Sequence, residues 1–441
     1  MKNRFFKYVS QNILAMIGLS LYILADTYFI SKAVGANGIT ALNMALPVYG
    51  VIFALGQMVG VGSAIRYSIV KEQYRNSNKD GSNECDKYFS GALFWGLVIG
   101  VIFAVVGLVF PDKIVEIMGG DETIVAIGVP YFRIFMSFSP FFIFNYTCNA
   151  FVRNDGNPSV SMAATLISSL FNIVFDYILM FPLGMGMPGA ALATALSPVV
   201  GVMICMIHFL SKKNTVKFKW FKTSLTRLFH CCQVGMSAFV GEMSGAVIVM
   251  VFNFIILRLT GNIGVAAYGV VANTALVAVA VFNGVALGSQ PLISESYGKH
   301  NIKDIKLIEK LGVATALGLA VIIVMMIWGF TDTIVGVFNS QGSDRLLSLA
   351  RVGLRIYFIG FLFAGINIFC SSALSAIASV KWAFVLSILK GFVVVNVCAA
   401  ILAPIFGMNG VWVAFPLSEF ILLIISGFAM KKSIGALESE R

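Results

Sequence analysis

The chain has 441 residues, of which 59% are hydrophobic and only 12% are charged. Soluble domains carry about 25% charged residues, so this composition, with a mean hydropathy of +0.90, excludes a soluble protein. In a bilayer, a long apolar run satisfies its own backbone hydrogen bonds only as a helix. The composition therefore predicts an all-α polytopic membrane protein.

Twelve apolar stretches are long enough to cross a bilayer as helices. The longest polar connection, a basic linker at 212–225, falls between the sixth and the seventh. We therefore expect an amino-terminal six-helix lobe over 1–211 and a carboxy-terminal six-helix lobe over 226–441. The predicted helices cover residues 11–31, 42–71, 87–110, 123–153, 158–181, 188–211, 227–260, 264–297, 303–330, 344–378, 380–405 and 410–432.

The net charge of +11 would suit a nucleic-acid-binding protein, but the basic residues are concentrated in alternate connections. This positive-inside pattern predicts that both termini are cytoplasmic, and it explains the charge without a nucleic-acid partner. The expected cytoplasmic residues are Lys2, Arg4 and Lys7 in the tail, Lys71, Arg75, Lys79 and Lys87 after the second helix, Lys212, Lys213, Lys217, Lys219, Lys222 and Arg227 around the linker, and Lys299, Lys303, Lys306 and Lys310 after the eighth helix.

Motifs for catalysis or metal binding are missing from the sequence. The seven cysteines are scattered apart from Cys231 and Cys232, and the three histidines are isolated, so we expect no disulfide, zinc site or other metal centre. No Walker A motif and no GxSxG motif occurs. We expect a protein that is not an enzyme and that has no cofactor.

The two halves resemble each other at fixed offsets. GANGITALNMALPV (35–48) aligns with GNIGVAAYGVVANT (261–274) at an offset of 226, and GAALATALS (189–197) aligns with GVWVAFPLS (410–418) at an offset of 221. Such similarity is typical of transporter repeats. Each half has six spans, so the halves share one orientation, and a central cavity that opens alternately to the two sides is the expected mechanism.

The fifth predicted helix contains a carboxylate in an otherwise apolar run. Asn172 and Asp176 are four residues apart and share a helical face, Thr194 follows in the sixth helix, and Asp26 lies in the first. With a rise of 1.5 Å per residue, these four groups lie roughly 21 to 27 Å from the cytoplasmic helix ends. Two carboxylates at one level favour a shared proton or a bound Na⁺. The alternatives are a structural Asp176, and an Asp26 in water if its helix begins near residue 5.

The repeat is interrupted at these positions. At an offset of 221, Asn172 and Asp176 fall on Val393 and Val397, and Thr194 falls on Phe415. The polar cluster therefore belongs to the amino-terminal lobe alone, which favours a functional role over a shared structural one.

The carboxy-terminal lobe has two intramembrane acids of its own, Glu242 and Glu419. Either could neutralise a cationic substrate, and Lys390 is a possible ion-pair partner. Met and Phe side chains would give the cavity an adaptable apolar wall. The candidates for this wall are Met44, Phe53, Met236 and Phe282.

Several stretches resemble one transporter family, MATE (multidrug and toxic compound extrusion), and within it the MepA-like bacterial branch. They are ADTYFISKAVG (25–35), FVRNDGNPSVSM (151–162), NIVFDYILMF (172–181), GAALATALS (189–197) and GNIGVAAYGV (261–270). The resemblance covers essentially the whole chain. It implies that Asp26, Asn172, Asp176 and Thr194 couple transport to a cation.

Two departures from the family pattern limit what is carried over. Relatives with a bending first helix have a proline there, whereas residues 11–31 contain none and Gly18 is only a weak hinge. Relatives of another branch have an acid in the seventh helix, and Glu242 lies about one turn before that place. The bending of the first helix and the role of Glu242 are therefore not implied.

The function we expect is a secondary multidrug efflux antiporter of the bacterial inner or plasma membrane. It would act as a monomer among membrane lipids and export small organic, mostly lipophilic cations in exchange for H⁺ or Na⁺. The alternative is a flippase for a lipid-linked precursor, which would need a strongly basic cavity for a pyrophosphate. The intramembrane charges here are mainly acidic, which favours the antiporter.

Overall fold

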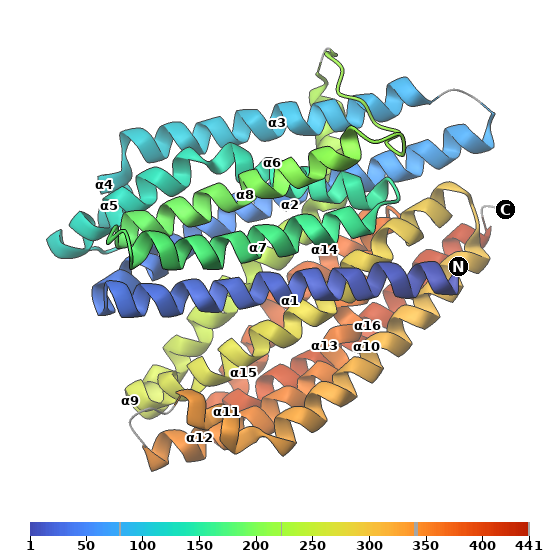
Figure 1. Ribbon diagram of the computed structural model, residues 1–441. Coiled ribbons are helices and arrows are strands. Elements are labelled where there is room, and N and C mark those ends of the chain that lie inside the picture. Colours follow the sequence, from blue (N-terminus) through green and yellow to red (C-terminus); the bar gives the residue numbers. More distant parts are fainter. Residues whose placement is uncertain (79–80, 222, 339–342, 440–441) are drawn as a thin grey trace. The chain divides into compact units, whose positions relative to one another are not determined.

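The computed structural model describes residues 1–78, 81–221, 223–338 and 343–439 (Figure 1). Lys79 and Lys222, two of the residues that we expect in cytoplasmic connections, lie outside these ranges. The described chain is helical and contains no strand. The predicted all-α class is confirmed.

Contacts divide the chain into two compact units. The first, which we call the amino-terminal unit, comprises Leu14–Glu242 with Tyr297–Lys299. Its helices are α1 (Lys2–Ala33, from Leu14 onward), α2 (Ala36–Asn76), α3 (Ser82–Val109), α4 (Pro111–Ile117), α5 (Glu122–Ser137), α6 (Ser139–Asn154), α7 (Pro158–Met180), α8 (Met187–Phe209) and the first turns of α9 (Leu225–Gly298).

The second, the carboxy-terminal unit, comprises Met1–Ile13, Met243–Ser296 and His300–Arg441. Besides most of α9 it contains α10 (Ile302–Gly329), α11 (Thr331–Phe338), α12 (Asp344–Tyr357), the 3₁₀ turn η1 (Phe358–Gly360), α13 (Phe361–Ala376), α14 (Val380–Ile388), the π-helical turn η2 (Leu389–Val393), α15 (Val394–Phe406) and α16 (Met408–Ser439).

The twelve predicted spans are all helical in the described residues. Ten helical segments are long and apolar enough to cross a membrane, and the bent pair α5–α6 makes an eleventh. One of the ten is α9, whose 74 residues include both the seventh and the eighth predicted span. The broken helices α12–α13 and α14–α15 each follow the course of one predicted span.

The fourth predicted helix, 123–153, is wrong in one respect, because it is not continuous. It is bent by 46° between α5 and α6. Pro140 lies in the first turn of α6, and a proline ring cannot follow an unbroken helix without clashing with the carbonyl of the preceding turn. The bend at Phe138 is the result.

The expected break between 260 and 264 is present as a single residue. Gly261 has φ 67° and ψ −157°, a conformation essentially limited to glycine, and helical structure continues on both sides of it.

Glycines also let helices approach each other closely. A Cβ added at Gly100 of α3 would lie 2.5 Å from the Cα of Pro140. Small residues serve this purpose in membrane helix packing.

The amino-terminal unit has an aromatic core between α2, α5 and α6. Tyr49 stacks on Phe135 with ring centroids 3.6 Å apart, and Phe142 packs edge-on against both. Tyr131 and Phe132 are fully buried beside them. This core holds α5 and α6 against α2 in spite of the bend, and it lies next to the polar residues described below.

We predict that Gly261→Ala destabilises the protein by about 1–3 kcal/mol, because the alanine Cβ is strained in this backbone conformation. A Cβ at this position would meet no atom within 4 Å, so the effect isolates the backbone. Thermal unfolding of the purified protein in detergent measures it.

Gly269→Ala is the matched control, since Gly269 lies in the same helix, has helical geometry and also faces open space. It should stabilise the protein by about 0.5–1 kcal/mol. Equal effects of the two substitutions would contradict the assignment of the break to Gly261.

Candidate functional site

The hairpin of α7 and α8 supplies three of the four predicted coupling residues. The two helices lie side by side (Figure 1), joined by a turn in which Gly184 and Gly186 have positive φ angles of 61° and 57°. Asn172 and Asp176 in α7 are completely buried, and Thr194 in α8 is almost so. The four-residue spacing does place the amide and the carboxylate on one buried face, as the sequence predicts.

Asn172 connects the other two side chains. In the amide orientation that satisfies both neighbours, its Nδ2 donates to Asp176 Oδ2 at 3.1 Å. Its Oδ1 then accepts from the Thr194 backbone N and from Thr194 Oγ1, both at 3.3 Å. One amide thus fixes the positions of a carboxylate and a hydroxyl from two helices.

Asp26 of α1 belongs to the same group. Its helix begins at Lys2, nine residues before the predicted start at residue 11, yet the side chain is only 7% exposed and is not in open water. It lies close enough to Asp176 for the two carboxylates to interact electrostatically. The structure therefore brings Asp26, Asn172, Asp176 and Thr194 together in the amino-terminal unit. Their role in coupling stays a prediction.

Three tyrosines surround the two carboxylates. Tyr22, Tyr49 and Tyr131 all interact electrostatically with Asp26, and the hydroxyls of Tyr49 and Tyr131 are 3.3 Å apart. None of these tyrosines is among the residues predicted from the sequence. Tyr22 lies one turn before Asp26 on the same helix, and this spacing could have identified it.

The carboxylates retain unused acceptor capacity. Among the described residues, neither Asp26 Oδ1 nor Asp176 Oδ1 has a hydrogen-bond partner, although both atoms are buried. Buried carboxylate oxygens need a partner, and two neighbouring anions repel each other. A proton or a monovalent cation held between them would meet both requirements.

The aligned positions of the two halves differ in burial at this helix. Val393 and Val397, the expected counterparts of Asn172 and Asp176, are 41% and 49% exposed, whereas their counterparts are fully buried. The buried positions of α7 match those of α14 at an offset of 222 and those of α15 at 223, because the π-helical turn η2 inserts one residue. At this offset Val395 and Ala399 take the buried positions of Asn172 and Asp176.

The polar cluster is still restricted to one half of the chain. Val395 and Ala399 are apolar, like the residues that the first alignment proposed. The α8 and α16 burial patterns match at an offset of 221, so Thr194 does correspond to Phe415. No counterpart of the three side chains is polar.

The two acids proposed for the carboxy-terminal lobe have different surroundings. Glu419 of α16 is buried and accepts a hydrogen bond from Asn367 Nδ2 at 2.7 Å, while Ser426 donates to Asn367 Oδ1 at 2.6 Å. Lys390, in the turn η2, interacts with Glu419 electrostatically. Glu242, which contacts place in the amino-terminal unit, accepts from Gln57 Nε2 at 2.8 Å.

The four apolar candidates for a cavity wall also differ in burial. Met44 and Phe53 are half-buried against the aromatic core of the amino-terminal unit, and Met236 is half-buried in α9. Phe282 is completely buried and stacks on Phe361. Their contact with a substrate stays a prediction.

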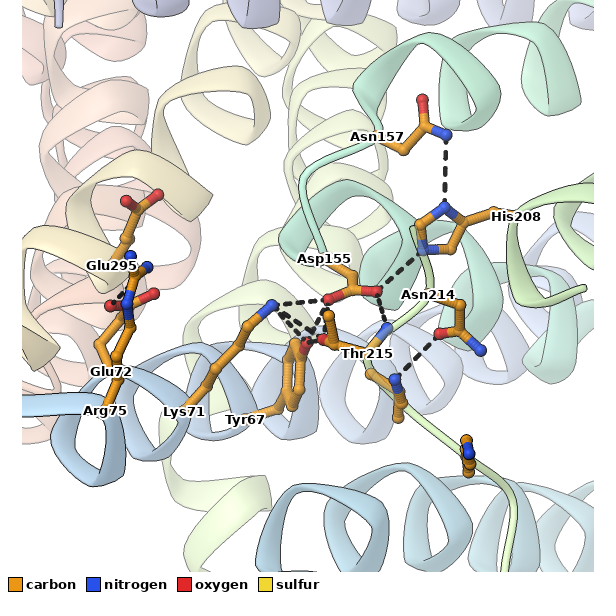
Figure 2. Close-up of polar contacts among 12 residues, drawn as sticks. Tyr67, Lys71, Glu72, Arg75, Asp155, Asn157, His208, Asn214, Thr215 and Glu295 are labelled. Atoms are coloured by element: carbon orange, nitrogen blue, oxygen red, sulfur yellow. Dashed lines mark hydrogen bonds and ion pairs between the residues drawn. The ribbon is translucent and has the colours of Figure 1, made fainter. Parts of the chain in front are cut away.

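A second polar cluster, which the sequence analysis missed, surrounds Asp155 in the connection between α6 and α7 (Figure 2). The Asp155 side chain is fully buried, forms an ion pair with Lys71 Nζ at 2.7 Å and accepts a hydrogen bond from His208 Nε2 at 2.9 Å. The Thr215 backbone N donates to it at 2.9 Å, and the hydroxyls of Tyr67 and Thr215 donate to it as well. Five donors from three segments of the chain, α2, α8 and the linker, thus converge on one carboxylate.

The remaining contacts set the charge state of this cluster. Asn157 Nδ2 donates to His208 Nδ1 at 3.3 Å, so the Nε2 atom carries the proton that His208 shares with Asp155. Burial alone would raise the pKa of Asp155, but the hydrogen bonds from His208 and Lys71 outweigh it and hold this pKa well below its usual range. Asp155 is therefore ionised at neutral pH, and its bonds to Thr215 fix the start of the linker.

The residues of this cluster are visible in the sequence, but nothing there indicates that they contact one another. His208 appeared isolated, and Lys71 was explained by the positive-inside pattern. Their common partner is separated from them by 53 and 84 residues. Only the packing of α2, α6 and α8 brings them together.

We predict that Asp155→Asn destabilises the protein by roughly 3 kcal/mol, because it leaves Lys71 and His208 without their anion. Since the pKa of Asp155 is lowered by folding, its contribution is complete above the ordinary value of about 4 and is lost as the pH falls through the lower folded value. Thermal unfolding in detergent between neutral and acidic pH tests both statements.

Asp332→Asn is the control, because Asp332 pairs with Arg351 at 2.6 Å but both side chains are exposed. It should change stability by less than about 1 kcal/mol. If the two variants unfold alike, the cluster has no special role in stability.

The comparisons with known proteins agree with this architecture. The family model MatE matches residues 12–178 and again 238–405. The two matches begin 226 residues apart, the offset at which the halves resemble each other. The duplication predicted from the sequence is therefore confirmed.

Relatives and solved structures cover nearly the whole chain. The multidrug export protein MepA of Staphylococcus aureus (strain bovine RF122 / ET3-1) is 27% identical over 418 residues, which are 92% of this chain and 88% of MepA. An outward-facing multidrug resistance MATE family transporter of the MOP superfamily has a TM-score of 0.92, with 22% identity and 99% and 96% of the two chains covered.

A third similarity shows the range of this fold. A MOP superfamily transporter from Pyrococcus furiosus, described as having a binding pocket of reverse polarity that suggests a different function, has a TM-score of 0.89 at 22% identity. The structural match covers 98% of this chain and 96% of that transporter. At this identity the solved structures show the fold, and the family follows from the two model matches, which span most of the chain. This protein belongs to the MATE family of membrane transporters.

Proposed function

We propose that the protein is a secondary antiporter that exports lipophilic organic cations in exchange for inward H⁺ or Na⁺. The observation that carries this proposal is the buried pair Asp26 and Asp176, each with an unpartnered carboxylate oxygen, next to Asn172 and Thr194. A scaffold shared by both halves would not need this pair in one half only. An intramembrane carboxylate pair is typical of ion coupling.

The same pair supplies a mechanism. Without a cation, two anions repel each other in a medium of low dielectric constant, so α1 is driven away from α7. A bound proton or Na⁺ removes the repulsion and stabilises the arrangement in which α1 packs against α7. If the exported compound favours the other arrangement, the two ligands compete for the protein, which is the thermodynamic requirement of antiport.

The substrate class rests on the relatives. The Staphylococcus proteins are named multidrug export proteins, and the intramembrane acids Glu242 and Glu419 of this chain suit a cationic compound. We place the protein in the bacterial plasma membrane with both termini in the cytoplasm, on the basis of its alternating basic connections.

The test is ethidium efflux from proteoliposomes with an imposed pH gradient or an imposed Na⁺ gradient. We expect one gradient to drive efflux in the unmodified protein, and its identity names the coupling ion. Asp176→Asn should lower efflux to the rate of liposomes without protein, because the amide can neither bind the proton nor supply the charge for Na⁺.

Asp112→Asn is the matched control, since Asp112 is an exposed acid at the start of α4. It should transport like the unmodified protein. Efflux that is indifferent to both gradients and to Asp176→Asn would contradict the coupling site and favour a flippase for a lipid-linked precursor.

A further inference from the structure

A cavity of about 640 Å³ lies inside the amino-terminal unit, away from the carboxylate pair. Its walls are α3, α6, α8, the linker between α8 and α9, and the first turns of α9, with Ser63 of α2. The deep part is apolar, with Leu93, Trp95, Leu97, Phe144, Val202 and Met206 among its lining residues. The part at the linker is basic.

The linker wall is fixed to α3 by hydrogen bonds. The backbone N of Lys217 donates to Asp86 Oδ1 at 2.7 Å, and the backbone N of Lys219 donates to Ser90 Oγ at 2.9 Å. Val216, between them and the Asp155 cluster, is 1% exposed. One wall of the cavity is therefore a segment held in a defined position.

Basic side chains outnumber acidic ones at this end. Lys87, Lys217, Lys219 and Arg227 line the cavity. Glu84 forms ion pairs with Lys87 and Arg227, and Asp86 forms one with Lys219. Two acids thus face four cations, and the exposed Lys212 and Lys213 add charge along the same linker. This excess of positive charge would attract an anion.

The dimensions and the aromatic residues suit an amphiphile. Lys87 and Leu97 are ten residues apart on α3, so the basic and apolar ends are about 15 Å apart. Phe218 and Trp220 of the linker are 51% and 85% exposed and pack edge to face. Exposed aromatic residues of this kind are typical of the membrane–water interface.

We propose that this cavity binds one anionic phospholipid of the surrounding membrane. Its phosphate lies among Lys87, Lys217, Lys219 and Arg227, and an acyl chain occupies the apolar part between α3 and α8. Clusters of basic residues beside a span are how membrane proteins recognise anionic headgroups. The positive end repels lipophilic cations, so this site is separate from the transport of the proposed substrates.

The experiment uses the full chain in nanodiscs of a neutral, unbrominated phospholipid. Trp95 lines the cavity, and bromine on an acyl chain quenches tryptophan fluorescence on contact. Small amounts of brominated phosphatidylglycerol should quench Trp95 to saturation, while brominated phosphatidylcholine with the same chains should quench it only weakly. The difference between the unmodified protein and Trp95→Phe gives the signal of Trp95.

Two variants test the two halves of the site. A Cβ added at Gly91 meets no atom within 4 Å, and Gly91 lines the cavity, so Gly91→Phe should fill it and abolish the excess quenching. Gly318→Phe is its control, because Gly318 also faces open space but lies in α10. Lys217→Glu, in the exposed linker, should abolish the preference for phosphatidylglycerol, whereas Lys113→Glu should not.

Several results would overturn the proposal. Equal quenching by the two brominated lipids would contradict the preference for an anionic headgroup. Quenching that persists in Gly91→Phe would show that the acyl chain lies outside the cavity. If inorganic phosphate alone abolished the quenching, the site would bind phosphate and not a lipid. Trp328, half exposed in the other unit, reports quenching by the bulk bilayer and must not show the preference.

Discussion

The structure depends on how buried carboxylates are satisfied in an apolar helical protein. Asp155 and Asp176 have side chains withdrawn from solvent, but their partners differ. Asp155 accepts from two cationic or protonated side chains, two hydroxyls and a backbone N–H, so its charge is neutralised within the protein. Asp176 has one amide donor and another carboxylate beside it, so its charge is left for an external ion to neutralise. The first arrangement stabilises the fold, and the second leaves a carboxylate pair that can bind an external ion.

Helical spans follow from composition, because an apolar run of sufficient length has only one stable conformation in lipid. Local backbone features are harder to predict. Pro140 and Gly261 were visible in the sequence, but a proline near a helix end and a glycine between two spans are compatible with several geometries. The structure shows that the fourth span bends by 46°, whereas α9 continues as a helix on both sides of Gly261.

The candidate site was predictable to the extent that it rests on spacing within one helix. Asn172 and Asp176 share a face because they are four residues apart, and their isolation in an apolar run singles them out. Tyr22, one turn before Asp26 on α1, could also have been found from its spacing. Tyr49, Tyr131 and the donors around Asp155 lie in other segments of the chain than the carboxylates with which they interact. In the sequence they are ordinary members of amphipathic surfaces, and nothing in their spacing indicates a common partner.

The π-helical turn at Leu389–Val393 has a consequence for the helix that follows it. One inserted residue rotates everything after it by about 100°, yet the buried stripe of α15 stays aligned with that of α7, so the turn absorbs the insertion. Gly391 makes this possible, since a Cβ there would lie 2.1 Å from the Ser244 side chain. A single wide turn thus accommodates an extra residue without changing which side chains of α15 face inward.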